Sequence, residues 1–271
     1  MLTLPRSLLG LRVLLTGASS GIGADVGAQL AGRGCRVAGT GRCASALALA
    51  PKGPLSAAIA RDLTQPGAAA EVVAAATGAL GGLDVVISNA GAGWSGPFES
   101  MEPDEIDAMV DINLRAPMHL AHAAAPYLLG SPGGGQLVLV GSIAGLVGVA
   151  GEAAYATAKA GLRGLADSLR AEWPAVTITL VSPGPVQTPF ARRRNQPYAR
   201  TWPKPLPVKS VSHAIVDAVE HRHTDVVVPA WMGTAARLNG GFPGLYRALA
   251  EVAGRLGGVA RDGRTAPATS R

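Results

Sequence analysis

Residues 16–23 read Thr16-Gly17-Ala18-Ser19-Ser20-Gly21-Ile22-Gly23 and join an apolar run, Leu11 to Thr16, to a stretch with helical periodicity, Ile22 to Arg33. This order predicts a strand, a glycine-rich turn and a helix. Gly17 suits the tight turn, Gly21 lets a ligand approach the backbone, and Gly23 permits close packing of the helix. The amino end of the helix offers N–H donors to a phosphate group. An ordinary glycine-rich turn has the same composition, so this segment alone leaves both interpretations open.

The alternation of strands and helices continues along the chain. Further strands are expected at Arg36 to Thr40, Leu55 to Ala60, Leu83 to Ser88, Gln136 to Gly141, Val176 to Val181 and Asp225 to Val228, and helices at Gly67 to Thr77, Asp104 to Leu129, Glu152 to Trp173 and Val211 to His221. The strands are continuous apolar runs, as expected when both faces are buried. The fold class is therefore α/β, a doubly wound, seven-stranded, mostly parallel sheet flanked by helices. Ligands of such sheets bind at the carboxyl ends of the strands.

Composition favours one compact domain, since 48% of the 271 residues are apolar and 4% are aromatic. We expect residues 1–230 to form it and residues 231–271 to form a helical extension with a disordered end. Cys35 and Cys43 belong to no close-spaced pair and are expected to be reduced. His119 and His122 share a helix face but have no third ligand nearby, so no metal site is expected.

The formal charge of +6 raises the question of nucleic-acid binding, but its distribution argues against it. Residues 189–209 carry six basic residues and no acid, namely Arg192, Arg193, Arg194, Arg200, Lys204 and Lys209. One loop thus explains the imbalance, although Tyr198 and Trp202 within it keep a nucleic-acid hypothesis open.

Residues 116–151 contain no charged side chain, yet Pro117, Pro126, Pro132 and the glycines at 133–135 interrupt them, so no membrane span is expected. The amino terminus shows no separate hydrophobic block with a cleavage site. We therefore expect a cytoplasmic protein.

Polar and small residues follow three further strands of the predicted sheet. Asn89-Ala90-Gly91 follows the fourth strand, Ser142 the fifth and Pro183-Gly184 the sixth, so all are expected at one edge of the sheet. Tyr155 and Lys159 are four residues apart on the next helix, so they share a face and reach the same site.

With these motifs in this order, the chain strongly resembles the short-chain dehydrogenase/reductase family from about Leu11 to Pro229. The resemblance implies an NAD(P)-binding Rossmann-fold oxidoreductase that moves a hydride between nicotinamide and a carbonyl or secondary alcohol. It implies a catalytic tetrad of Asn113, Ser142, Tyr155 and Lys159. Cofactor contacts are expected from Gly17, Ser19, Ser20, Gly21, Ile22, Gly23, Arg42, Asp62, Leu63, Asn89, Ala90, Gly91, Tyr155, Lys159, Pro183, Gly184, Val186 and Thr188.

The roles follow from the chemistry of the reaction. A carbonyl that accepts hydride needs a proton donor, and a phenol with a pKa of about 10 is a poor base for the reverse reaction. The Lys159 ammonium and the positive charge of oxidised nicotinamide are expected to favour phenolate at Tyr155, while Ser142 hydrogen-bonds the substrate oxygen and Asn113 positions a water. Each side chain alone is compatible with an ordinary structural role. A non-catalytic dinucleotide-sensing regulator is the alternative function, but it would be expected to lack Tyr155 or Lys159.

The cofactor is predicted from Thr40-Gly41-Arg42 at the end of the second strand. NAD would call for an acidic residue where Gly41 stands, whereas the Arg42 guanidinium suits the 2′-phosphate of NADP. Ser20 stands where some family members have a second basic residue, so NAD remains possible but less favoured.

Two segments bear on the substrate and one on assembly. Five prolines make Pro189 to Pro207 irregular, and we expect a substrate lid whose basic residues face either an acidic substrate or solvent. Beyond Pro229, Leu245, Leu249, Val252 and Leu256 have helical spacing, which suits a cap on the pocket, a subunit interface or a membrane surface, in that order. The uncharged helix from Ala116 to Leu129 favours a homodimer or homotetramer.

Overall fold

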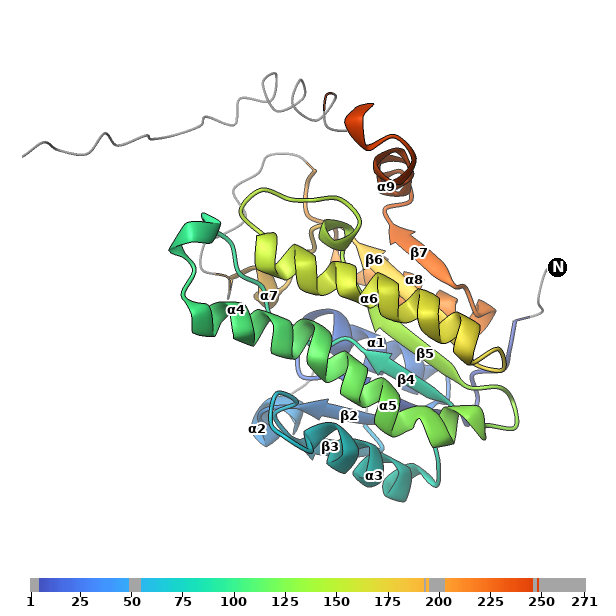
Figure 1. The fold of residues 1–271 in the computed structure, drawn as a ribbon. Coiled ribbons are helices and arrows are strands. Elements are labelled where there is room, and N and C mark those ends of the chain that lie inside the picture. Colours follow the sequence, from blue (N-terminus) through green and yellow to red (C-terminus); the bar gives the residue numbers. More distant parts are fainter. Residues whose placement is uncertain (1–4, 49–54, 193, 195–202, 246–247, 249–271) are drawn as a thin grey trace, which may run out of the picture.

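The structure, a computed structural model, describes residues 5–48, 55–192, 194, 203–245 and 248. Its centre is a seven-stranded parallel sheet in the order β3-β2-β1-β4-β5-β6-β7 (Figure 1). The strands are β1 (Arg12–Thr16), β2 (Arg36–Gly41), β3 (Ala57–Ala60), β4 (Val85–Ser88), β5 (Gln136–Val140), β6 (Thr177–Pro183) and β7 (Asp225–Val228). The doubly wound fold expected from the sequence is confirmed, and β3 and β4 each begin two residues later than predicted.

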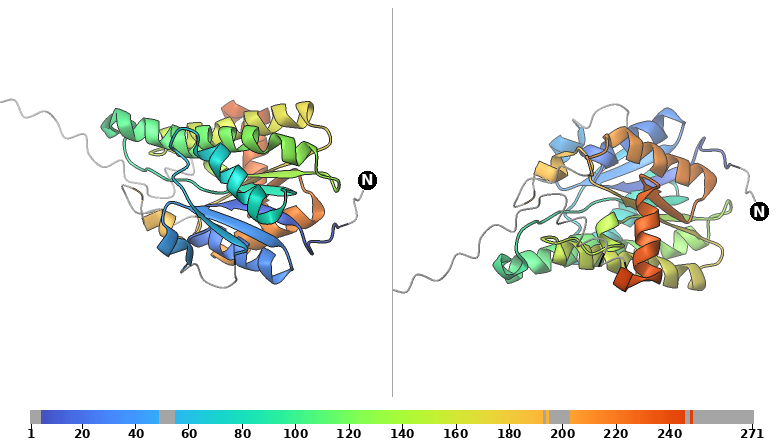
Figure 2. Two further views of the ribbon diagram at one scale, coloured as in Figure 1. Left: turned by 90° about the horizontal axis from the view of Figure 1, so that it is seen from below. Right: turned by 90° about the horizontal axis from the view of Figure 1, so that it is seen from above.

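Helices cover both faces of the sheet (Figures 1 and 2). They are α1 (Gly21–Gly32), α2 (Ala44–Ala48), α3 (Ala68–Leu80), α4 (Pro103–Val110), α5 (Ala116–Leu129), α6 (Ala153–Glu172), α7 (Pro189–Arg192), α8 (Val208–His221) and α9 (Met232–Gly241). One face carries α3, α5 and α6, and the other carries α1 and α8. The short helices α2 and α7 were not expected, whereas α9 lies within residues 231–271, where a helical extension was predicted.

The strands are apolar throughout because each packs in two directions. Leu14 belongs to the core beneath α3 and α5, where it joins Leu80 and Leu120. Its neighbours Val13 and Leu15 point the other way, into the core beneath α1 and α8. A buried strand of this kind needs no polar alternation, which is why the continuous apolar runs predicted the parallel sheet.

The helix expected from Asp104 to Leu129 is interrupted. Between α4 and α5 the backbone stays helical but widens into a π-helical turn at Asp111–Arg115. Such turns are rare and often occur at functional sites. Pro126 lies inside α5, which ends at Leu129 as predicted, and the buried Ala124 and Leu128 on either side stabilise the turn that contains it. Among the described residues, no helix combines the length and the apolar character needed to cross a membrane.

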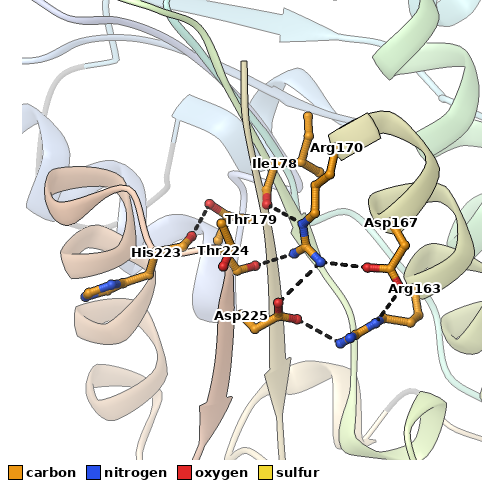
Figure 3. A network of polar contacts seen from close by, with 8 residues as sticks. All are labelled: Arg163, Asp167, Arg170, Ile178, Thr179, His223, Thr224 and Asp225. Atoms are coloured by element: carbon orange, nitrogen blue, oxygen red, sulfur yellow. Dashed lines mark hydrogen bonds and ion pairs between the residues drawn. The ribbon is translucent and has the colours of Figure 1, made fainter. Parts of the chain in front are cut away.

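Helix α6 is anchored to the edge strand β7 by a network of ion pairs (Figure 3). Asp225 accepts from Arg163 at 2.8 Å and from Arg170 at 3.2 Å, and Asp167 pairs with both arginines. Arg170 also donates to the carbonyl groups of Ile178 and Thr224. The network fixes the carboxyl half of the helix whose amino half carries Tyr155 and Lys159.

Parts of two predictions lie outside the described residues. In the proposed lid these are residues 193 and 195–202, including Tyr198 and Trp202, and in the extension they are residues 246–247 and 249–271, including Leu249, Val252 and Leu256. Within the described part, Leu245 is exposed. Cys35 is buried, Cys43 is exposed, and both are free thiols as expected.

Candidate active site

The glycine turn after β1 leaves the amino end of α1 open. Gly17 and Gly21 have φ values of 69° and 57°, a left-handed backbone that favours glycine. A Cβ at Gly23 would collide with the carbonyl oxygen of Gly17, so the helix packs against the turn as expected. Ser20 is the N-cap residue, but its side chain makes no cap hydrogen bond. The first N–H groups of α1 therefore keep their capacity to bind an anion.

Thr16 ties this turn to the end of β4, and the sequence interpretation missed it. Its buried hydroxyl accepts hydrogen bonds from the backbone N–H groups of Asn89 and Ala90, both at 2.9 Å. The Asn89 amide donates to the Thr16 carbonyl oxygen at 3.0 Å. A buried threonine as the last residue of a strand, directly before the glycines, was the available signal.

Gly41, Arg42 and Asp62 lie together at the far end of the site. A Cβ at Gly41 would lie 3.4 Å from the Ser19 hydroxyl oxygen. Arg42 is exposed and close enough to Asp62 for its charge to lower the pKa of that carboxyl group, although hydrogen bonding to the Thr64 backbone is the larger cause. This end therefore offers one exposed guanidinium and one anionic carboxylate.

Asn113 lies in the π-helical turn and is fully buried. Its side-chain amide donates to the carbonyl oxygens of Ala92 at 2.9 Å and Met109 at 3.0 Å. Its Oδ1 has no hydrogen-bond partner among the described residues. A Cβ at Gly91 would lie 2.7 Å from that oxygen and 3.6 Å from Lys159 Nζ, so the glycine keeps both groups accessible to each other.

Ser142, Tyr155 and Lys159 meet beside Asn113 at the end of β5. Ser142 accepts from the Ala144 N–H at 3.1 Å and lies close enough to the Tyr155 hydroxyl group to lower its pKa. Lys159 Nζ donates to the Val140 carbonyl oxygen at 2.9 Å and lies 5.9 Å from the centre of the Tyr155 ring. The structure thus brings the four predicted tetrad residues to one place.

Burial is the largest cause of the pKa shifts of Tyr155 and Lys159. It raises the pKa of Tyr155 to about 12, and the nearby Ser142 hydroxyl group offsets only part of that rise. Burial also lowers the pKa of Lys159 to about 8. Near neutral pH the Tyr155 hydroxyl group therefore keeps its proton, whereas the pKa of the Lys159 ammonium group lies only about one unit above neutral.

A wall beside Tyr155 contains residues that the sequence interpretation did not single out. The Phe190 ring centre lies 5.9 Å from that of Tyr155. Arg194 donates to Glu152 Oε1 at 2.6 Å. A Cβ at Gly93 would lie 2.7 Å from Phe190 and 3.1 Å from Arg194 Cγ, so both side chains cover this glycine. The only sequence signal for these residues was the excess of basic side chains after Pro189, which were expected to face either an acidic substrate or solvent.

The remaining predicted contacts come from the segment after β6 and from side chains that face the core. Pro183 and Gly184 are buried, and a Cβ at Gly184 would lie 2.8 Å from Met232 Sδ in α9. Thr188 is buried against Gly21, whose Cβ would lie 3.2 Å from its methyl group. The side chains of Ile22, Leu63 and Val186 pack against the two cores, so these three residues offer the site only their backbone.

Comparison with known proteins agrees with this geometry. A family model described as short chain dehydrogenase matches residues 12–199. The chain is 37% identical over 215 residues to 1-deoxy-11-beta-hydroxypentalenate dehydrogenase of Streptomyces avermitilis, covering 76% of this chain and 80% of the relative.

Two solved structures share the fold. A short chain dehydrogenase/reductase from Burkholderia phymatum in complex with NAD superposes with a TM-score of 0.78 at 19% identity, over 89% of this chain and 96% of the other. An alcohol dehydrogenase from Thermococcus sibiricus complexed with 5-hydroxy-NADP gives 0.70 at 22% identity, over 79% and 94%.

Proposed function

The chain belongs to the short chain dehydrogenase family and is an oxidoreductase, and on this premise we propose that it uses NADP(H) to interconvert a carbonyl compound and a secondary alcohol. The observation that carries the proposal is the meeting of Ser142, Tyr155 and Lys159 with the buried Asn113 beside an open helix terminus. A dinucleotide-sensing regulator has no need for a half-buried tyrosine and a buried lysine at this position.

The site fits a nicotinamide dinucleotide, the cofactor class of the family. The uncapped amino end of α1 and the left-handed Gly17 and Gly21 suit the pyrophosphate. Asp62 and Asn89 would hold the adenosine and ribose ends, and Thr188 would lie over the glycine turn. When bound, the nicotinamide supplies or accepts the hydride.

Tyr155 is the proposed acid and base. With a pKa of about 12, it holds its proton at neutral pH and can donate it to a carbonyl oxygen that gains charge. Ser142, which lies beside that hydroxyl group, would hydrogen-bond the substrate oxygen next to it. Lys159, with a pKa of about 8, would replace the proton through a water held by the buried Asn113 oxygen, which has no donor among the described residues.

We propose NADP(H) over NAD(H) because of Arg42. The end of β2 carries Gly41 rather than an acidic side chain, so this position has no carboxylate to prefer the free 2′-hydroxyl group of NAD over a 2′-phosphate. The exposed Arg42 guanidinium follows directly and suits a charge-assisted pair with that phosphate.

We propose residues 1–230 as the catalytic domain, with residues 189–207 as its lid, and α9 as a cap rather than a separate unit. Met232 packs on Gly184, and Asn239 donates to the Leu146 carbonyl oxygen at 3.1 Å. The helix thus bridges the segments that follow Pro183 and Ser142. These contacts support the role of the extension as a cap on the substrate pocket.

The test is a panel of ketones and secondary alcohols followed by NADPH and NADH absorbance. The relative from Streptomyces avermitilis is named for a hydroxypentalenate, so the panel includes cyclic hydroxy acids. Turnover of at least one compound, faster with NADP(H), supports the proposal. Nicotinamide binding without any turnover would favour the regulator.

A further inference from the structure

A buried ion pair stands in the wall of the candidate active site. Arg194 and Glu152 lie 2.6 Å apart, and their side chains are only 10% and 11% exposed. Every other ion pair between described residues has at least one partner that is 27% or more exposed. Removing two charges from water is unfavourable unless hydrogen bonds compensate. A pair buried beside a reaction centre therefore calls for an explanation.

The pair lies close to the proposed proton donor. Glu152 is the residue directly before α6 and stands three positions before Tyr155, which lies in the first turn of that helix. Phe190 contacts the Tyr155 ring, and Phe190 and Arg194 cover the same glycine, Gly93. The charges of Glu152 and Arg194 also shift the Tyr155 pKa in opposite directions. A group bound to Arg194 would thus belong to the same molecule that meets Tyr155.

The guanidinium has donors to spare. Its Nη2 donates to Glu152, while its Nε is buried and has no acceptor among the described residues. The Trp94 indole N–H, one residue after Gly93, is also buried without a described acceptor. A buried donor without a partner destabilises a structure until an acceptor arrives. The free edge of a guanidinium matches the two oxygens of a carboxylate.

We propose that Arg194 binds a carboxylate of the substrate through the edge that Glu152 leaves free, so that the preferred substrates are keto acids or hydroxy acids. Glu152 holds the guanidinium in the wall and sets the strength of binding, since its own charge repels the incoming anion. The inference rests on the proposed oxidoreductase function and names its substrate class.

The experiment compares keto acids with their methyl esters. The probes are 4-oxopentanoate, 4-oxocyclohexanecarboxylate and 9-oxodecanoate, each with its ester, and the measured quantity is the ratio of kcat/KM for acid to ester with NADPH. We expect a wild-type ratio of at least about tenfold for one pair, from the strength of a charge-assisted bidentate contact. Arg194→Gln should bring the ratio to about one or below, and Arg194→Lys should restore part of it.

Glu152→Gln separates binding from structure. If Arg194 binds the carboxylate, removing the neighbouring negative charge raises the acid-to-ester ratio, opposite to Arg194→Gln. If the pair only holds the wall together, both variants change acid and ester equally and the ratio stays constant, which would overturn the inference. Arg163→Gln, on the outer side of α6, is the matched control and should leave the ratio unchanged.

Two outcomes keep this inference distinct from the proposed function. Ester turnover without any preference for an acid overturns the inference and leaves the oxidoreductase function standing. If no ketone is turned over, calorimetric titration with the same acids decides: binding that Arg194→Gln abolishes and Glu152→Gln strengthens supports the carboxylate site, and absence of binding overturns it.

Discussion

Replacing Tyr155 by phenylalanine removes one hydroxyl group and leaves the ring in contact with Phe190. With a pKa of about 12 for Tyr155, only about one molecule in 10⁵ is ionised at pH 7, so nearly all of the protein holds the proton needed for reduction. Loss of a positioned proton donor lowers a rate by about 10²–10⁴-fold. We therefore expect kcat for carbonyl reduction to fall by that factor, equivalent to about 3–5 kcal/mol in activation free energy.

The variant should remain folded and bind its cofactor. The ring keeps its contact with Phe190 and one polar group is removed, so the free energy of unfolding should change by no more than about 1.5 kcal/mol. The assay is steady-state absorbance of NADPH, with cofactor affinity from fluorescence titration and stability from urea unfolding. Tyr127→Phe, on an exposed position of α5 away from the candidate active site, is the matched control for loss of a phenol hydroxyl group and should not change the rate.

The opposite direction gives an independent measurement. Alcohol oxidation needs Tyr155 as a base, so its rate should rise with pH as the phenolate fraction grows about tenfold per pH unit below the pKa. Carbonyl reduction does not use the phenolate, so its rate should not rise with pH in this way.

A Tyr155→Phe protein with kcat within threefold of wild type would show that another group transfers the proton, and the assignment of Tyr155 as the acid and base would then be wrong.

Three further predictions concern cofactor, stability and assembly. Arg42→Ala should lower kcat/KM for NADP(H) at least about tenfold more than for NAD(H), because one charge-assisted contact is lost. Arg33→Ala is the control, since Arg33 pairs with Glu220 away from the site, and it should change kcat/KM for neither cofactor. Equal weakening with both cofactors would contradict the assignment of Arg42 to the 2′-phosphate. Asp84→Asn should cost about 1–2 kcal/mol at pH 7 after allowance for solvent screening, because hydrogen bonding to Arg12 lowers the Asp84 pKa from 3.8 to about 2. The folded pKa lies below the unfolded one, so this stabilisation is complete above about pH 4 and is lost as the pH falls through about 2; a variant whose urea midpoint differs from wild type by the same amount at pH 7 and pH 2.5 would refute it. Sedimentation at micromolar concentration should show a dimer or tetramer, because Met118, Tyr127 and Leu129 on α5 are 46%, 40% and 47% exposed, and a stable monomer would contradict this.

The repeating units of the fold were evident from the sequence. Continuous apolar runs alternate with helical periodicity, and this local pattern records which residues face a core on both sides of a sheet. Parallel strands joined by helices bring their carboxyl ends to one edge. The shared edge at which the glycine turn, Asn89, Ser142 and the Tyr155–Lys159 pair lie therefore followed from the sequence alone.

The properties that depend on contacts between distant segments came only from the tertiary structure. The π-helical turn that holds Asn113 has no sequence signal, because the same residues also satisfy an ordinary helix. The sequence interpretation expected Lys159 to favour the phenolate form of Tyr155, whereas burial in the structure raises the Tyr155 pKa and lowers that of Lys159. Desolvation depends on everything that surrounds a group and not on its neighbours in the chain.

The pairing of Arg194 with Glu152 shows the same division. The sequence showed an excess of basic residues after Pro189 and left open whether they face solvent or a substrate. Glu152 is 42 residues away in the chain, so no periodicity or spacing connects the two. Local periodicity determined the elements and the edge at which the polar residues meet, and packing of the connecting segments determined which charges are buried there.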